Sequence, residues 1–334
     1  MRFHPRFCPR PDCPSRSSGH RRWCFKGRFH RACDGRTVQR FLCLECCRTF
    51  STQTFRVDYR LKKPNLSLSL FGPFISKVTH RQAARVLGCS RRTVAHRLGL
   101  LGDHCRSFHR WRLSQAAGKL RPSKVFQLDE LETFEHSRRL APLTMPVLIE
   151  RSSYFILDLE TAPLPCRGGL SKGDRLRKEE RERRLGRRKS GSRKAVERCV
   201  DTLANVMACS AVVRVQTDRK VTYAPILERS FGSRLAHQRY SSKEKRDYKN
   251  PLFPINHTLA MMRDGISRLV RRSWAASKLR ERLERHAWIW VTWRNYVRGI
   301  TNKSPRVTPA MAFGVEERKW TGAELCAWKV FPSH

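Results

Sequence analysis

Carboxylates gather in one short stretch of a chain that is otherwise strongly basic. The stretch Lys124–His136, KVFQLDELETFEH, holds four of them. A second acid of interest, Asp218, ends the run SAVVRVQTD. Two carboxylates that converge repel each other unless a divalent cation lies between them, and Mg²⁺ prefers such oxygen ligands. Asp129 and Asp218 are therefore candidate ligands for Mg²⁺ or Mn²⁺, and metal ions held in this way promote attack on a phosphodiester.

The apolar pattern predicts the strands that would position these two acids. We expect a strand at VFQLDELETF, two more in MPVLIERSSYFILDLETAP on either side of residues 151–153, and a fourth at SAVVRVQTD. A fifth strand carries His237 and Arg239. Helices follow from Ile255 onward. This order predicts a ribonuclease H-like α/β fold, a mixed sheet flanked by helices, in which an acid on the first strand meets an acid at the end of the fourth.

A basic insertion separates the third predicted strand from the fourth. In residues 166–194, Arg or Lys stands at nearly every second position, so we expect this segment to be exposed, partly helical and mobile. The segment KAVERCVDTLANVMA follows it and has the period of an amphipathic helix. The expected buried face of that helix consists of Val196, Cys199, Leu203 and Val206.

Two short cysteine turns near the N-terminus predict a zinc ribbon. They are FCPRPDCP and FLCLECC, and the expected ligands are Cys8, Cys13, Cys43 and Cys46. Zinc binds four thiolates in a tetrahedron and selects soft sulfur ligands. Cys24, Cys33 and Cys47 could replace one of the four, and buried reduced cysteines without metal are the alternative. The basic residues around these turns favour contact with a DNA backbone.

The segment THRQAARVLGCSRRTVAHRLGLLG predicts a helix-turn-helix around residues 88–90. Ser90 can cap the second helix, whose inner face would be Val94, Leu98 and Leu101. The residues expected to face outward, toward the major groove of DNA, are Arg91, Arg92, Thr93, His96 and Arg97. An ordinary helical hairpin with a solvated basic face is the alternative.

The large positive charge of the chain predicts that it binds a polyanion. Among 334 residues, 70 are Lys or Arg and 28 are Asp or Glu, which gives a formal net charge of +42. Such a field opposes compaction, and nucleic acid is the first candidate to neutralise it. The sequence shows neither a membrane-spanning apolar run nor the apolar core of a signal peptide, so we expect no membrane partner and a cytoplasmic, nucleoid-associated protein.

The order of these features resembles bacterial insertion-sequence transposases of the DDE class, chiefly the group with an amino-terminal zinc ribbon. The features are the cysteine turns, the helix-turn-helix, and the segments LDELETF, TDRKVTY and SRLVRRSWAASK. The resemblance covers most of the chain. It implies an enzyme that binds terminal inverted repeats in double-stranded DNA, nicks them, and joins the 3′ hydroxyls to target DNA with Mg²⁺ or Mn²⁺. By the same analogy it acts as a homo-oligomer on DNA.

One position departs from the family pattern. Aligning SRLVRRSWAASK with it places Asn256 where the third catalytic acid, a glutamate, normally stands. The Asn256 amide could orient the metal more weakly, and His257 could serve as a ligand or general base. Glu130 and Asp264 are other possible third ligands. The alternatives to an active enzyme are a catalytically inactive, transposase-derived DNA-binding regulator and a protein that binds or cleaves RNA.

These features divide the chain into three predicted units. They are a zinc ribbon at 1–60, a helix-turn-helix DNA-binding domain at 61–115, and a ribonuclease H-like catalytic domain at 122–334 that carries the basic insertion. A linker containing GKLRPSK joins the last two.

Overall fold

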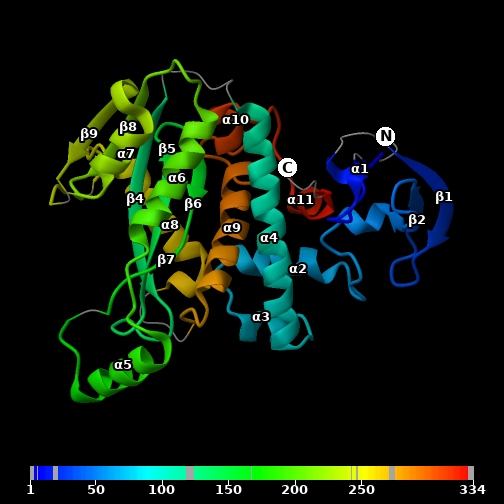
Figure 1. Cartoon of the computed structure of the whole chain (residues 1–334), viewed down its shortest axis with the longest axis horizontal. Helices are drawn as coiled ribbons and strands as arrows, with labels where there is room; N and C mark the ends of the chain where they lie inside the picture. Colours follow the sequence, from blue (N-terminus) through cyan, green and yellow to red (C-terminus); the bar gives the residue numbers. More distant parts are fainter. Residues whose placement is uncertain are drawn as a thin grey trace.

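The computed structural model describes most of the chain (Figure 1). The described residues are 4–5, 7–17, 22–117, 124–166, 168–241, 243–245, 247–270 and 275–329. The predicted linker GKLRPSK, apart from Lys124, lies outside these ranges, as do residues 271–274 of SRLVRRSWAASK. All 28 Asp and Glu residues of the chain lie within them.

The amino-terminal unit is a small antiparallel sheet. Its elements are α1 (Pro14–Ser17), β1 (Trp23–His30), β2 (Thr37–Cys43), β3 (Thr49–Ser51) and the 3₁₀ helix η1 (Thr52–Phe55). The strand order is β1-β2-β3. Phe41 and Phe50 stack at 5.4 Å between ring centroids, and both belong to a separate apolar core with Phe7 and Phe55. Phenylalanines and cysteines make up the buried residues of this small core.

The predicted helical hairpin follows. It consists of α3 (His80–Val86) and α4 (Arg91–Ala116), and α2 (Leu66–Ile75) precedes it. The turn lies where we expected it, with Gly88 at φ 57°, a conformation that favours glycine. The Thr93 amide donates to Ser90 Oγ at 3.0 Å, so Ser90 caps α4 as predicted. The predicted inner face, Val94, Leu98 and Leu101, is fully buried. With 26 residues, α4 is much longer than a recognition helix requires.

A mixed sheet forms the centre of the chain. Its strands are β4 (Val125–Phe134), β5 (Pro142–Glu150), β6 (Ile156–Leu159), β7 (Ala162–Pro163), β8 (Val213–Asp218) and β9 (Leu235–Tyr240). Their order is β6-β5-β4-β8-β9, with β7 paired to β5. The β4, β5 and β6 ladders are antiparallel, whereas β8 pairs in parallel with both β4 and β9. These strands confirm the predicted mixed sheet.

Helices cover both faces of this sheet. The helices of this part of the chain are α6 (Ser192–Val206), α7 (Tyr223–Phe231), η2 (Gly232–Arg234), α8 (Phe253–Gly265), η3 (Ser267–Leu269), α9 (Arg280–Tyr296), α10 (Pro309–Phe313) and α11 (Gly322–Ala327), of which α11 packs on α2 and α4. Phe126 and Leu128 of β4 share a core with α6 and α7, whereas Leu131 shares one with α8 and α9. The alternation of side chains along β4 thus separates the two cores.

Two predictions for the segment between the third and fourth strands are confirmed. The predicted inner face of α6 is buried along its whole length. The basic insertion is partly helical and contains α5 (Lys172–Leu185), which has no buried side chain and lies away from the sheet (Figure 1). Its expected mobility stays a prediction.

The main hydrophobic core crosses the predicted boundary between the helical hairpin and the sheet. It contains Phe74 of α2, Phe108 of α4, Leu203 of α6 and Phe313 of α10. In the described part of the chain, α4 therefore belongs to both predicted units, because its first turns form the hairpin and its later turns pack against the helices of the sheet.

Three buried histidines predict a loss of stability in mild acid. His104, His109 and His286 each donate from Nε2 to a backbone carbonyl at 2.7 to 2.8 Å. Burial lowers the pKa of His104 and of His109 to about 4, and that of His286 to about 3. The unfolded chain therefore binds more protons, so the stabilisation is present above pH ~6.5 and is lost as the pH falls toward 4.

Urea unfolding at pH 7.5 and pH 5 checks this expectation. The free energy of unfolding should fall by about 1 kcal/mol or more per histidine over this range. His286→Gln should flatten the pH dependence, and His30→Gln, at an exposed position, should leave it unchanged. Equal pH dependence in the His286 variant and the wild type would show that this histidine does not contribute.

Candidate functional site

The four predicted cysteines converge in the amino-terminal unit. Their Sγ atoms all lie within 4.8 Å of one another, and three of the four side chains are buried. Cys8 Sγ is 3.7 Å from Cys46 Sγ, and Cys13 Sγ is 3.6 Å from Cys43 Sγ. A tetrahedron with Zn–S bonds of about 2.3 Å requires sulfur separations of roughly 3.8 Å. The donor set is therefore compatible with a structural zinc ion.

Local structure explains why these four meet and the others do not. Cys8 and Cys13 flank a turn before α1, Cys43 ends β2, and Cys46 lies in the turn that leads to β3. The remaining candidates, Cys24, Cys33 and Cys47, are exposed and lie outside the cluster. The prediction selected the correct four because short cysteine turns bring two sulfurs to the same side of a loop.

Asp129 and Asp218 lie on the same face of the central sheet. Gln127 pairs with Gln216 in the parallel β4–β8 ladder, and Gln127 Nε2 donates to Gln216 Oε1 at 2.8 Å. Because side chains alternate along a strand, the residues two positions further on, Asp129 and Asp218, project to the same side. Both line a cavity of about 650 Å³. The fold therefore brings both acids to the same cavity, and the sharing of a divalent ion between them stays a prediction.

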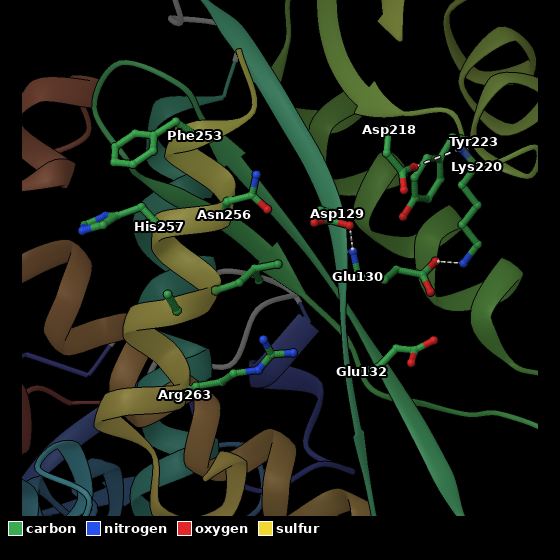
Figure 2. Close-up of a pocket in the computed structure, with 12 residues that line it drawn as sticks. Asp129, Glu130, Glu132, Asp218, Lys220, Tyr223, Phe253, Asn256, His257 and Arg263 are labelled. Atoms are coloured by element: carbon green, nitrogen blue, oxygen red, sulfur yellow. Dashed lines mark hydrogen bonds and ion pairs between the residues drawn. The ribbon is translucent and has the colours of Figure 1, made fainter. Parts of the chain in front are cut away.

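Helix α8 brings Asn256 to this cavity. The Ile255 amide donates to Gln127 Oε1 at 3.0 Å, and Gln127 Nε2 donates to the Pro251 carbonyl at 2.7 Å, so the start of α8 is tied to β4. Figure 2 shows the Asn256 amide pointing from α8 toward Asp129. Two carboxylates and one amide can thus face a shared space, which is an oxygen-rich donor set of the kind that Mg²⁺ or Mn²⁺ prefers.

His257 does not point at the acids, which corrects its assignment as a ligand or general base. Figure 2 shows its ring on the side of α8 away from Asp129. The ring stacks on Phe253 at 5.7 Å and meets Tyr154 edge-on at 5.8 Å. Burial, together with Arg294 and Arg298, lowers the pKa of His257. His257 also lines the cavity. Successive residues on a helix lie about 100° apart, however, so α8 directs the Asn256 amide toward Asp129 and the His257 ring away from it.

Neither alternative acid completes the set. Glu130 projects from the other face of β4, where it accepts from Lys220 Nζ at 2.7 Å and Thr144 Oγ1 at 2.6 Å (Figure 2). Asp264 has an 84% exposed side chain and pairs with Lys77 at 3.1 Å. Among the described residues, the four cysteines are the only cluster of three or more His, Cys, Asp or Glu side chains with metal-ligand geometry.

The cavity also contains functional candidates that the sequence analysis missed. Lys220 and Arg263 line it and bring positive charge, and the Lys220 amide donates to Asp218 Oδ1 at 3.0 Å. Tyr223 lines it too, with 1% of its surface exposed and a buried hydroxyl that has no hydrogen-bond partner. Burial and the nearby Glu130, Asp129 and Asp218 raise the pKa of Tyr223, so its hydroxyl stays protonated. The signal was present in TDRKVTY, where Lys220 and Tyr223 follow Asp218 within five residues.

The predicted DNA-reading residues of α4 divide into two groups. Arg91, Arg92 and His96 are exposed, and Thr93 is half-buried against Ser90. Arg97 is a correction, because it is 4% exposed and its guanidinium donates to Ser67 Oγ at 3.1 Å and to the Lys63 carbonyl at 2.8 Å. It lies three residues after Val94, which places it beside the inner face of the helix. Arg97 therefore joins α4 to α2 and does not face a groove.

No protein-family model matches the chain, and no curated protein shows significant similarity to it. In the described part of the chain, no helix combines the length and the apolar character needed to cross a membrane.

The cysteine geometry predicts one zinc ion per chain. Metal analysis of the purified protein should find it, and Cys13→Ser should weaken zinc affinity by at least about 10- to 100-fold because a buried ligand is lost. Cys47→Ser is the matched control, since this exposed thiol lies outside the cluster. Full zinc content in the Cys13 variant would contradict the site.

Because the Tyr223 hydroxyl is buried without a partner, we expect that its removal does not destabilise the protein. Tyr223→Phe should leave the free energy of unfolding unchanged or raise it by up to about 1 to 3 kcal/mol, because an unsatisfied buried group is removed. Tyr296→Phe is the control: its hydroxyl lies 3.1 Å from His109 Nδ1, so its loss should cost about 1 kcal/mol. Chemical denaturation of both variants compares them, and destabilisation by Tyr223→Phe would show that this hydroxyl is satisfied in solution.

Proposed function

We propose that the chain is a DNA transposase of the DDE class with a ribonuclease H-like catalytic domain. The single observation that carries the proposal is the cavity where Asp129, Asp218 and Asn256 meet, formed by β4, β8 and α8. The strand order, with three antiparallel strands followed by parallel β8 and β9, supports the proposed ribonuclease H-like fold. The amino-terminal unit would be its zinc ribbon and α3–α4 its helix-turn-helix.

The proposed reaction is in-line attack on phosphorus, first by water and then by a DNA 3′ hydroxyl. Divalent ions, when bound, activate the nucleophile and stabilise the leaving oxygen. Asp129 and Asp218 would hold them by their carboxylates, and Asn256 would add a neutral oxygen. Arg263 at the cavity wall would bind the phosphate, and Lys220 keeps Glu130 engaged on the opposite face of β4.

The proposed partners are the terminal inverted repeats of an element and its target DNA. The net charge of +42 and the exposed Arg91, Arg92 and His96 support duplex binding with a steep salt dependence. The mutually close Cys Sγ atoms support a structural zinc ion in the same DNA-binding region. Bringing two DNA ends together would require a homo-oligomer on DNA.

A specific observation favours a second candidate, a DNA-binding regulator derived from a transposase. Asn256 is uncharged, and among the described residues no third carboxylate forms a metal-ligand cluster with Asp129 and Asp218. Glu130 and Glu132 line the same cavity, and Glu244 lines a small neighbouring cavity with Asp129, Asp218 and Asn256, but none of the three completes such a cluster. An amide oxygen neutralises less metal charge than a carboxylate does. Such a chain would bind element ends and leave them intact.

A plasmid assay separates the two candidates. Supercoiled plasmid that carries the element ends should be nicked in Mg²⁺ or Mn²⁺, and Asp129→Asn or Asp218→Asn should lower the rate at least about 100-fold because a metal ligand is lost. Asn256→Glu should raise the rate, since it restores a third acid. Asp264→Asn, at an exposed acid outside this cavity, is the control. Tight binding of the ends without metal-dependent nicking, in both the wild type and Asn256→Glu, would support the regulator.

A further inference from the structure

Three arginines and a histidine from four elements meet where the helical hairpin packs on the rest of the fold. They are Arg268 of η3, Arg282 of α9, His80 of α3 and Arg91 of α4. Arg268 Nη2 lies 3.4 Å from His80 Nε2, and Arg282 Nη1 donates to the Ala95 carbonyl of α4 at 2.9 Å. The pKa of His80 is lowered to about 4, chiefly by burial and further by each of the three arginines. We call this set the junction cluster.

No carboxylate balances the junction cluster. Within the described ranges, which contain every Asp and Glu of the chain, none of its three arginines forms an ion pair. Arg268 donates from Nη1 to Ser277 Oγ at 3.3 Å, but its Nε is buried without a hydrogen-bond partner. Burial and Arg282 together lower the pKa of Arg268 to about 10.

Burying a guanidinium without a counter-charge is costly, and the cost falls when an anion binds. Phosphate is the anion that fits, because a guanidinium fork offers parallel N–H donors and several cations can share its oxygens. Arg91 also belongs to the exposed face of α4 that we propose to read DNA. A phosphate held here would therefore lie beside bases in reach of that face.

We propose that the junction cluster is a phosphate-binding site that takes one backbone phosphate of duplex DNA and fixes the helical hairpin and the sheet to the same strand. This inference rests on the proposed DNA binding but not on catalysis. Phosphate contacts set the register of a protein on DNA and carry no sequence information themselves. The site therefore contributes equally to the binding of element ends and of other duplexes.

Fluorescence anisotropy with labelled duplexes at several salt concentrations tests the site in the full chain with zinc. Arg268→Gln should weaken binding to the element end and to a random duplex by the same factor. The log of the association constant falls as the log of the salt concentration rises, and the steepness (slope) of this fall should decrease by about 0.9 in the variant. Arg268→Lys, which keeps the charge, should restore most of that slope. Arg234→Gln removes the same charge at the far edge of the sheet, in η2 before β9, and should leave the slope unchanged.

A stability measurement tests whether Arg268 has only a structural role. Thermal unfolding of Arg268→Gln without DNA should occur at or above the wild-type temperature, because a partly buried charge that has no carboxylate partner is removed. A marked decrease would show that Arg268 serves to hold η3 in place. The exposed variant Arg91→Gln then provides a second test of the DNA effect, with the same expected change of slope.

Two further experiments distinguish a DNA backbone phosphate from free inorganic phosphate as the bound anion. In a series of duplexes, each has one phosphate replaced by a neutral methylphosphonate at a different position. One of these replacements should weaken binding to the wild type, and the same replacement should not change binding to Arg268→Gln. Inorganic phosphate, added at constant ionic strength, should stabilise the wild type only weakly. Strong stabilisation by inorganic phosphate with an unchanged DNA slope in the variant would assign the site to free phosphate and overturn the proposal. Absence of salt-dependent DNA binding in the wild type would instead refute the proposed function.

Discussion

The parallel pairing of β4 with β8 fixes the geometry of the acidic site. It sets Gln127 opposite Gln216, and the direct hydrogen bond between their side chains holds that register from within the fold. A slip of one residue would turn either Asp129 or Asp218 to the opposite face of the sheet. The same Gln127 amide binds the backbone at both Pro251 and Ile255. One buried side chain therefore positions both acids and the helix that carries Asn256.

The long helix α4 has a comparable role for the surface that we propose to bind DNA. Its first turns carry the exposed basic residues, and its later turns lie in the main core. His109 of α4 donates to the Leu157 carbonyl of β6 and lies beside the Tyr296 hydroxyl of α9. Because these bonds are buried, α4 cannot rotate against the sheet without breaking them. The basic face and the acidic cavity are therefore parts of one packed body.

Much of this arrangement could be predicted from local sequence patterns. Strands, the inner face of α6, the Ser90 cap and the four clustered cysteines each depend on residues that lie close together in the chain. Arg97 was misplaced because a charged residue was assumed to face solvent, although its spacing from Val94 places it inside. His257 and Tyr223 depend on how α8 and α7 are rotated against the sheet, and that rotation is set by packing between distant segments. Spacing in TDRKVTY indicates that Tyr223 follows Asp218 closely in the chain, but it does not show how α7 is rotated against the sheet.

The chain has 28 Asp or Glu residues and 70 Lys or Arg residues. The positions of the carboxylates therefore decide which basic side chains have a counter-charge within the protein. Asp58, 3% exposed, accepts from Arg36 at 2.7 Å and Arg56 at 2.9 Å, and this arginine cluster is balanced within the protein. The junction cluster also gathers arginines from several elements, but no acid lies at its centre. Since buried cations require a counter-charge, the first cluster stabilises the fold by itself. The second cluster is balanced only when an anion from outside the chain binds to it.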